Sequence, residues 1–163
     1  MPSGGGYIIR AVCFGHQLIA HALGGEVGGN PNGASFGNVR VSKAAKVVPD
    51  PLFDSLPDSM EMKVFHYQSV VKLPEGANIL ANSPRDPYYA VRYADNVWGV
   101  QFHPEFDCEI LERTIDVYAT DMFAAGFDVD DLRALNKFDS SGHKLLQRFI
   151  EISELQNSKA AVD

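Results

Sequence analysis

The chain has 163 residues, of which 45% are hydrophobic, and this is enough for one globular domain with an apolar core. A net charge of −7 and a pI near 5.1, without any cluster of Lys and Arg, exclude a nucleic-acid-binding surface from the expected functions. No apolar run has the length of a membrane span and MPSGGG is not a secretory signal, so we expect a cytoplasmic protein, without membrane contact, whose two cysteines are reduced.

A strand followed at once by a helix is predicted near the start of the chain. Residues 7–14 (YIIRAVCF) have the apolar pattern of a short strand buried in a parallel sheet. Residues 15–23 place apolar side chains on one helical face, and Gly24 and Gly25 provide a left-handed stop. Glycine and asparagine dominate residues 28–37, which we expect to form a loop.

Strand patterns fill the middle of the chain, and helical patterns fill its end. β-Branched residues resume over residues 38–48, and four further strands are predicted over residues 62–67, 78–82, 88–93 and 97–102. Apolar spacing and capping residues then predict three helices, from after Glu105 to Gly126, over residues 128–138, and from Ser140 or Ser141 to about residue 152. Because no repeat or linker divides the chain, we expect one domain over residues 1–163.

The first strand–helix junction places a cysteine at the carboxyl end of a strand, where open α/β folds bind ligands. Cys13 occupies this turn, Gly15 avoids crowding at the bend, and the small Ala11 serves the same purpose. Free N–H groups at the start of the helix favour the thiolate form of the sulfur. A cysteine in such a turn can also be an inert core thiol, so its interpretation depends on a second motif.

The second motif is GVQFHPEF, residues 99–106. His103 follows a predicted strand, and Pro104 keeps the backbone extended. Because residues i and i+2 of an extended segment project to the same side, Glu105 can bond to one ring nitrogen of His103 and leave the other for a thiol. Together the motifs predict Cys13 as nucleophile, His103 as acid and base, and Glu105 as the orienting carboxylate. The alternative is a buried histidine followed by a surface glutamate.

The motifs C-F-G-H-Q and Q-F-H-P-E, in this order, resemble the two signature motifs of class I, triad-type glutamine amidotransferases, in particular those of GMP synthase and its free-standing relatives. Residues 66–74 (HYQSVVKLP) are similar to the family's His-x-Asp segment and Leu-Pro turn, so the resemblance covers about residues 8–153. It implies an α/β fold with an open, mainly parallel, flavodoxin-like sheet flanked by helices, and an added β-rich antiparallel segment. No metal or other cofactor is expected, because no convincing ligand spacing is present.

The resemblance also implies hydrolysis of the glutamine side-chain amide, with the ammonia passed to an acceptor supplied elsewhere. Cys13 would attack the amide carbon and form a glutamyl thioester. His103 would protonate the departing ammonia and later activate water, while Glu105 orients and charge-stabilises His103. The backbone N–H of Phe14 would help to hold the oxyanion.

The resemblance implies that a second group of residues binds the substrate: Phe14, Gly15, Gln17, His66, Tyr67 and Gln68. Two of these have structural alternatives, since Gln17 can be a solvated helix residue and His66 a hydrogen-bonded core histidine. Gln68 replaces the family's usual Asp, and Ser35 stands where many members carry Glu. Contacts to the amino-acid part of glutamine are therefore expected to differ from those of the family.

Only twelve residues precede Cys13, whereas family members have further strands there and a glycine-containing loop that completes the oxyanion hole. We therefore expect an N-terminally truncated, partial domain. Because an oxyanion donor is missing, we expect impaired catalysis by the chain alone. The strand of Cys13 is expected to lie at a sheet edge that is covered by a second copy of the chain or by a partner chain.

Three functions follow from these features. The first is a glutamine amidotransferase subunit or stand-alone glutaminase. The second is a γ-glutamyl peptidase that uses the same three residues on a γ-glutamyl amide, which the changes at Ser35 and Gln68 keep open. The third is a non-catalytic interaction protein that retains the catalytic residues but lacks the oxyanion loop.

Overall fold

Eight strands and four helices make up residues 7–45 and 49–160, the part of the chain that the computed structural model describes. In chain order they are β1 Ile9–Val12, α1 Phe14–Ala22, β2 Glu26–Gly29, β3 Ser35–Lys43, β4 Ser59–His66, β5 Gln68–Lys72, β6 Asn78–Ser83, β7 Asp86–Ala94, β8 Val97–Val100, α2 Cys108–Ala124, α3 Val129–Ala134 and α4 Ser141–Ala160. None of the helices in these ranges has an apolar stretch long enough to cross a membrane.

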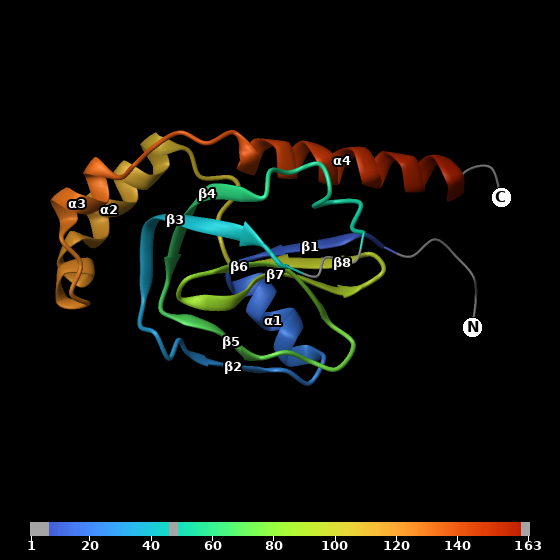
Figure 1. The fold of residues 1–163 in the computed structure, drawn as a ribbon, viewed down its shortest axis with the longest axis horizontal. Helices are drawn as coiled ribbons and strands as arrows, with labels where there is room; N and C mark the ends of the chain where they lie inside the picture. Colours follow the sequence, from blue (N-terminus) through green and yellow to red (C-terminus); the bar gives the residue numbers. More distant parts are fainter. Residues whose placement is uncertain (1–6, 46–48, 161–163) are drawn as a thin grey trace.

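Six of the strands form one sheet in the order β1-β8-β7-β6-β3-β4, and β2 pairs with β5 in a separate antiparallel ribbon (Figure 1). β1 and β8 are parallel, and the other neighbours in the sheet are antiparallel. Residues 84–85 join β6 to β7 and residues 95–96 join β7 to β8, and such short connections permit only antiparallel pairing. The expected α/β class is confirmed. The expected parallel part of the sheet is limited, in the described residues, to the β1–β8 pair, and the expected antiparallel addition forms the rest, because its strands are joined by short connections.

Helices cover both faces of the six-stranded sheet, with α4 on one side and α1 on the other (Figure 1). On the α4 face, Leu145 and Ile152 pack in one cluster with Trp98 of β8. On the opposite face, Ala20 of α1 packs with Val91 of β7. The alternation of strand side chains between the two faces gives each helix its own apolar contact surface.

The helices α2 and α3 form a further packed unit beside β3. Leu111 of α2 and Leu132 of α3 are buried against Phe36 of β3. Both helices begin at an aspartate whose carboxylate accepts backbone N–H groups of the first turn, Asp107 for α2 and Asp128 for α3. The cap at Asp107 places the start of α2 directly after the His-Pro-Glu motif.

Most predicted strands and helices are confirmed with ends shifted by a few residues, α4 continues eight residues beyond its expected end near residue 152, and two other segments differ. The expected loop over residues 28–37 contains the end of β2 and the start of β3, and residues 68–72, for which no strand was predicted, form β5. The sequences EVGG and QSVVK have no clear apolar alternation, and they are extended because they pair with each other. Within the expected strand 38–48, β3 ends at Lys43, and residues 46–48 lie outside the described residues.

Candidate active site

Cys13 lies in the sharp turn between β1 and α1 that the sequence predicts. Its φ of 49° and ψ of −106° make it the one non-glycine residue with positive φ among the described residues. Such a conformation is strained for an L-residue, and it is held here because the backbone N–H of Cys13 donates to the carbonyl of Val100 at 2.8 Å. A Cβ atom at Gly15 would lie 3.1 Å from Cβ of Ala11, so both positions need small residues.

The parallel pairing of β1 with β8 brings the two sequence motifs to one edge of the sheet. Val12 lies opposite Val100, so Cys13 and His103 both follow the carboxyl ends of adjacent strands. The backbone N–H of His103 donates to the carbonyl of Lys63 at 2.8 Å, which fixes the segment after β8 against β4. The ring nitrogen Nδ1 of His103 bonds to Oε1 of Glu105 at 2.7 Å, and the Cys13 thiol is near enough to affect the pKa of the ring.

These neighbours change the ionisation of His103. Burial alone would lower its pKa, but the hydrogen bonds and charges of Cys13 and Glu105 outweigh burial and raise the pKa from 6.5 to about 9. Burial would raise the pKa of Glu105, but the interaction with His103 and the charge of Arg10 lower it. At neutral pH the site therefore holds an imidazolium beside a carboxylate.

Two buried glutamines connect Cys13 to the segment after β4. Nε2 of Gln17, on α1, donates to the backbone carbonyl of Gln68 at 2.8 Å and to Oε1 of Gln101 at 3.1 Å. Nε2 of Gln101 donates in turn to the sulfur of Cys13 at 3.5 Å, and the thiol lies 3.9 Å from the carbonyl oxygen of Phe65. Gln17 is thus buried within the site and is not a solvated helix residue.

Gln101 is the site residue that sequence reasoning missed. It is the first residue of the Q-F-H-P-E motif, and its side chain is 0% exposed although it is polar. The available signal was a polar residue at the end of an otherwise apolar strand pattern, two positions before the histidine. Its contact with Cys13 depends on the pairing of β1 with β8, which the sequence does not specify.

The other implied substrate-binding residues are distributed between core and surface. His66 is buried, and both of its ring nitrogens bond within the protein, Nδ1 to the carbonyl of Gln68 at 3.0 Å and Nε2 to the hydroxyl of Tyr89 at 2.9 Å. Burial lowers the pKa of His66 to about 4, so the ring is neutral. Tyr67 is half-exposed, and the Phe14 ring is 72% exposed at the start of α1.

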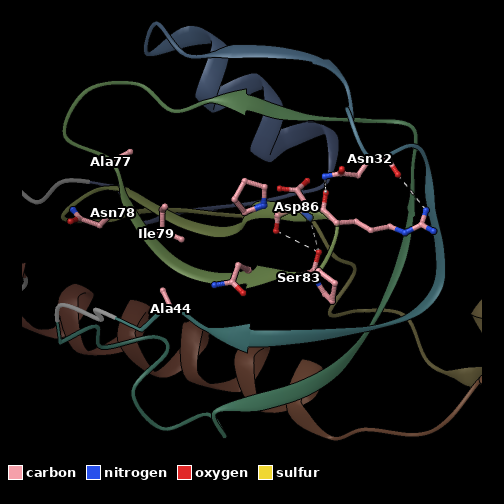
Figure 2. Close-up of a pocket in the computed structure, with 11 residues that line it drawn as sticks. Asn32, Ala44, Ala77, Asn78, Ile79, Ser83 and Asp86 are labelled. Atoms are coloured by element: carbon pink, nitrogen blue, oxygen red, sulfur yellow. Dashed lines mark hydrogen bonds between the residues drawn. The ribbon is translucent and has the colours of Figure 1, made fainter.

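A hollow of about 570 Å³ lies apart from these residues, between the β6–β7 turn and the loop at Asn32 (Figure 2). Its wall includes Asp86, which is buried and whose pKa is raised by burial. None of the predicted catalytic or substrate-binding residues lines this hollow. Among the described residues, no group of His, Cys, Asp and Glu side chains is arranged to hold a metal ion.

Comparison with known proteins places this chain among the class I glutamine amidotransferases. A family model described as glutamine amidotransferase class-I matches residues 6–115. The GMP synthase [glutamine-hydrolyzing] of Thermosipho africanus (strain TCF52B) is 38% identical over 117 residues, which are 68% of this chain and 22% of that protein. Gamma-glutamyl peptidase 5 of Arabidopsis thaliana is 34% identical over 110 residues, which are 66% of this chain and 44% of that protein. The crystal structure of a glutamine amidotransferase from Thermotoga maritima superposes with a TM-score of 0.73 at 24% identity, covering 88% of this chain and 61% of that one.

The fold and the site define an α/β protein that has a cysteine at a strand–helix turn and a His–Glu pair after the adjacent strand. The chain belongs to the class I glutamine amidotransferase family. It spans 22% of the length of the matched GMP synthase, 44% of that of the matched γ-glutamyl peptidase and 61% of that of the Thermotoga protein.

Proposed function

We propose that this chain hydrolyses the side-chain amide of glutamine through Cys13, His103 and Glu105 and releases ammonia for a separate acceptor. The observation that carries the proposal is the position of the His103–Glu105 pair, bonded at 2.7 Å, after the strand that pairs with the strand of Cys13, whose thiol is near enough to raise the pKa of His103. A carboxylate on one nitrogen fixes the ring and leaves the other nitrogen to exchange protons with the substrate. The matched GMP synthase, named as glutamine-hydrolysing, supports the choice of reaction.

The proposed reaction proceeds in two halves. The sulfur of Cys13 attacks the amide carbon, and the resulting oxyanion is held in part by the backbone N–H of Phe14. The C–N bond breaks as the imidazolium of His103 gives its proton to the leaving nitrogen, so that ammonia departs and a glutamyl thioester remains. The neutral imidazole then takes a proton from water, the hydroxide attacks the thioester, and glutamate leaves as the C–S bond breaks.

We assign the binding of the substrate to the residues around this centre. Gly15 permits close approach at the start of α1, Gln17 bonds to the backbone carbonyl of Gln68, and the side chains of Tyr67 and Gln68 are exposed and free to contact a ligand. His66 would act indirectly, because its Nδ1 holds the carbonyl of Gln68 in place. The family's Glu position is taken by Ser35, a buried residue whose hydroxyl lies within hydrogen-bond distance of the Tyr89 hydroxyl, at 3.2 Å.

An ammonia-release assay with glutamine tests the proposal. The wild-type chain should release ammonia, and Cys13→Ser should reduce the rate by a factor on the order of 10³ or more, because the nucleophile is removed. Cys108→Ser is the matched control, since Cys108 is the other free cysteine among the described residues and lies outside the site. Ammonia release that survives in Cys13→Ser would overturn the assignment of the nucleophile.

The same assay with γ-glutamyl dipeptides tests the second candidate function. Two observations favour it: the similarity to Arabidopsis γ-glutamyl peptidases 4 and 5, at 36% and 34% identity, and the changes at Ser35 and Gln68. A higher kcat/KM for the dipeptides than for glutamine would assign the chain as a γ-glutamyl peptidase. If the folded wild type, alone or with a partner, turned over neither substrate, the remaining candidate function would be that of a non-catalytic interaction protein.

We further propose that another strand, from a second copy or a partner chain, covers β1. In the described part of the chain, β1 pairs with β8 and with no other strand. The N–H groups of Ile9 and Cys13 bond to the β8 side, so those of Arg10 and Val12 point outward. The buried atoms Nε and Nη1 of Arg10 also have no hydrogen-bond partner among the described residues. A covering strand would supply acceptors and, by ordering this edge, raise the catalytic rate.

A further inference from the structure

We infer that Gln101 is a hydrogen-bond donor to the nucleophile, and that its side-chain amide favours the thiolate form of Cys13 and fixes the position of the sulfur. This inference goes beyond the proposed function because it concerns the state of the sulfur before any substrate binds. It does not require that glutamine be the substrate.

The backbone of Gln101 is fixed by the sheet. Its N–H donates to the carbonyl of Tyr89 on β7 at 2.9 Å, directly after the last residue of β8. The side chain is fully buried and ends 3.5 Å from the sulfur of Cys13, a normal distance for an N–H donor to sulfur. A buried amide in this position cannot turn to water, so its hydrogen bonds must be made inside the site.

The neighbouring hydrogen bonds determine which end of the Gln101 amide faces the sulfur. The carbonyl of Gln68 only accepts hydrogen bonds, so the group of Gln17 that contacts it must be the NH₂ group. The same NH₂ group of Gln17 contacts Gln101 and requires the oxygen of Gln101 as its acceptor. The NH₂ group of Gln101 is therefore the one directed at Cys13, and the opposite orientation would bring two donors together.

An N–H donor interacts more strongly with a charged sulfur than with a neutral one. Three other titratable groups lie near the sulfur: His103 and Glu105 after β8, and Tyr89 on β7. Arg10 on β1 and His66 on β4 are more distant and act on Glu105 and His103 rather than on the sulfur. Tyr89 remains neutral, because burial raises its pKa above the usual value. Gln101, as a hydrogen-bond donor, and His103, as a nearby positive charge, are thus the two side chains that favour the anion, in addition to the free N–H groups at the start of α1.

The test is the rate of alkylation of Cys13 by iodoacetamide as a function of pH, in a Cys108→Ser background. Gln101→Met keeps the length of the side chain and removes the donor, and Gln101→Glu keeps an acceptor for Gln17 but replaces the donor with a carboxylate. We expect the pH midpoint of alkylation to move upward by about one unit in Gln101→Met because the donor is lost, and further in Gln101→Glu because a negative charge is added. The exposed Gln147→Met is the matched control and should leave the midpoint unchanged.

Unchanged midpoints in both Gln101 variants, with circular dichroism and thermal unfolding showing a folded chain, would overturn the inference. If Gln101→Met does not fold, Gln101→Leu takes its place, because it also removes the donor and adds no charge beside the sulfur. Alkylation needs no glutamine, so a chain without ammonia release but with a shifted midpoint would contradict the proposed function and still support the role of Gln101.

Discussion

At the scale of single residues, the neighbours of His103 determine its ionisation, and its ionisation determines whether it can give a proton in the proposed reaction. Its imidazolium is stabilised by the two groups it contacts, although the ring is largely buried. The proton on this ring is the one that the proposed reaction gives to ammonia. The pH dependence of activity and of stability should therefore report the same group.

We predict that kcat/KM for glutamine falls as the pH rises through about 9, where His103 loses its proton. In Glu105→Gln the carboxylate is lost, so the pKa of His103 should decrease and this high-pH limb should move to lower pH, with a rate reduced by about 10²-fold. The exposed Glu75→Gln is the control. An unmoved limb in Glu105→Gln would contradict the assignment of the limb to His103.

The raised pKa has a second consequence for stability. Because the folded value of about 9 exceeds the ordinary value of 6.5, the contribution of His103 to stability is complete below pH 6.5 and is lost as the pH rises through about 9. Urea unfolding should show this loss for the wild type and not for His103→Gln. This comparison needs no substrate, so it separates the ionisation of His103 from its proposed catalytic role.

At the scale of elements, β8 is the strand that assembles the site, because it pairs with β1 and leads into the His-Pro-Glu segment. Its glycine at position 99 allows α1 to pack closely on this strand. A Cβ atom there would lie 2.4 Å from Nδ1 of His16 and 2.9 Å from Cε2 of Tyr93. His16 is fully buried, and its Nδ1 bonds to the Tyr93 hydroxyl at 3.0 Å, so neither ring has free space.

Gly99→Ala should therefore destabilise the protein by about 1–3 kcal/mol, the usual cost of overpacking a filled core. Gly28→Ala is the matched control in β2, since a Cβ atom there meets no heavy atom within 4 Å. The free energy of unfolding in urea is the measurement. Equal effects of the two substitutions would show that the contact with His16 does not restrict the size of the side chain at position 99.

The parts of the site that the sequence predicts are those encoded in local motifs. The turn at Cys13 and the His103–Glu105 contact each depend on residues close in the chain, and both are found. The contact between Gln101 and Cys13 spans 88 positions and depends on the pairing of β1 with β8. β2 and β5 were missed for the same reason, because their strand conformation comes from their partner and not from their own pattern.

At the scale of the whole molecule, the outer edge of β1 is the surface proposed to contact a second chain. We predict that light scattering detects association of the chain with itself or with a partner, and that amide exchange at Arg10 and Val12 slows on association. Arg10→Met should weaken the association because it removes donors that lack acceptors in the described residues, while Arg113→Met on the exposed face of α2 should not. A monomer at all concentrations, with already protected amides at these two positions, would contradict the prediction.

The carbonyl oxygen of Gln68 accepts hydrogen bonds from both Nδ1 of His66 and Nε2 of Gln17. A carbonyl oxygen has two lone pairs, so this acceptor is saturated before any ligand arrives. If glutamine binds here as proposed, its ammonium group must therefore find its acceptors at other oxygen atoms, because this carbonyl has no lone pair left to offer.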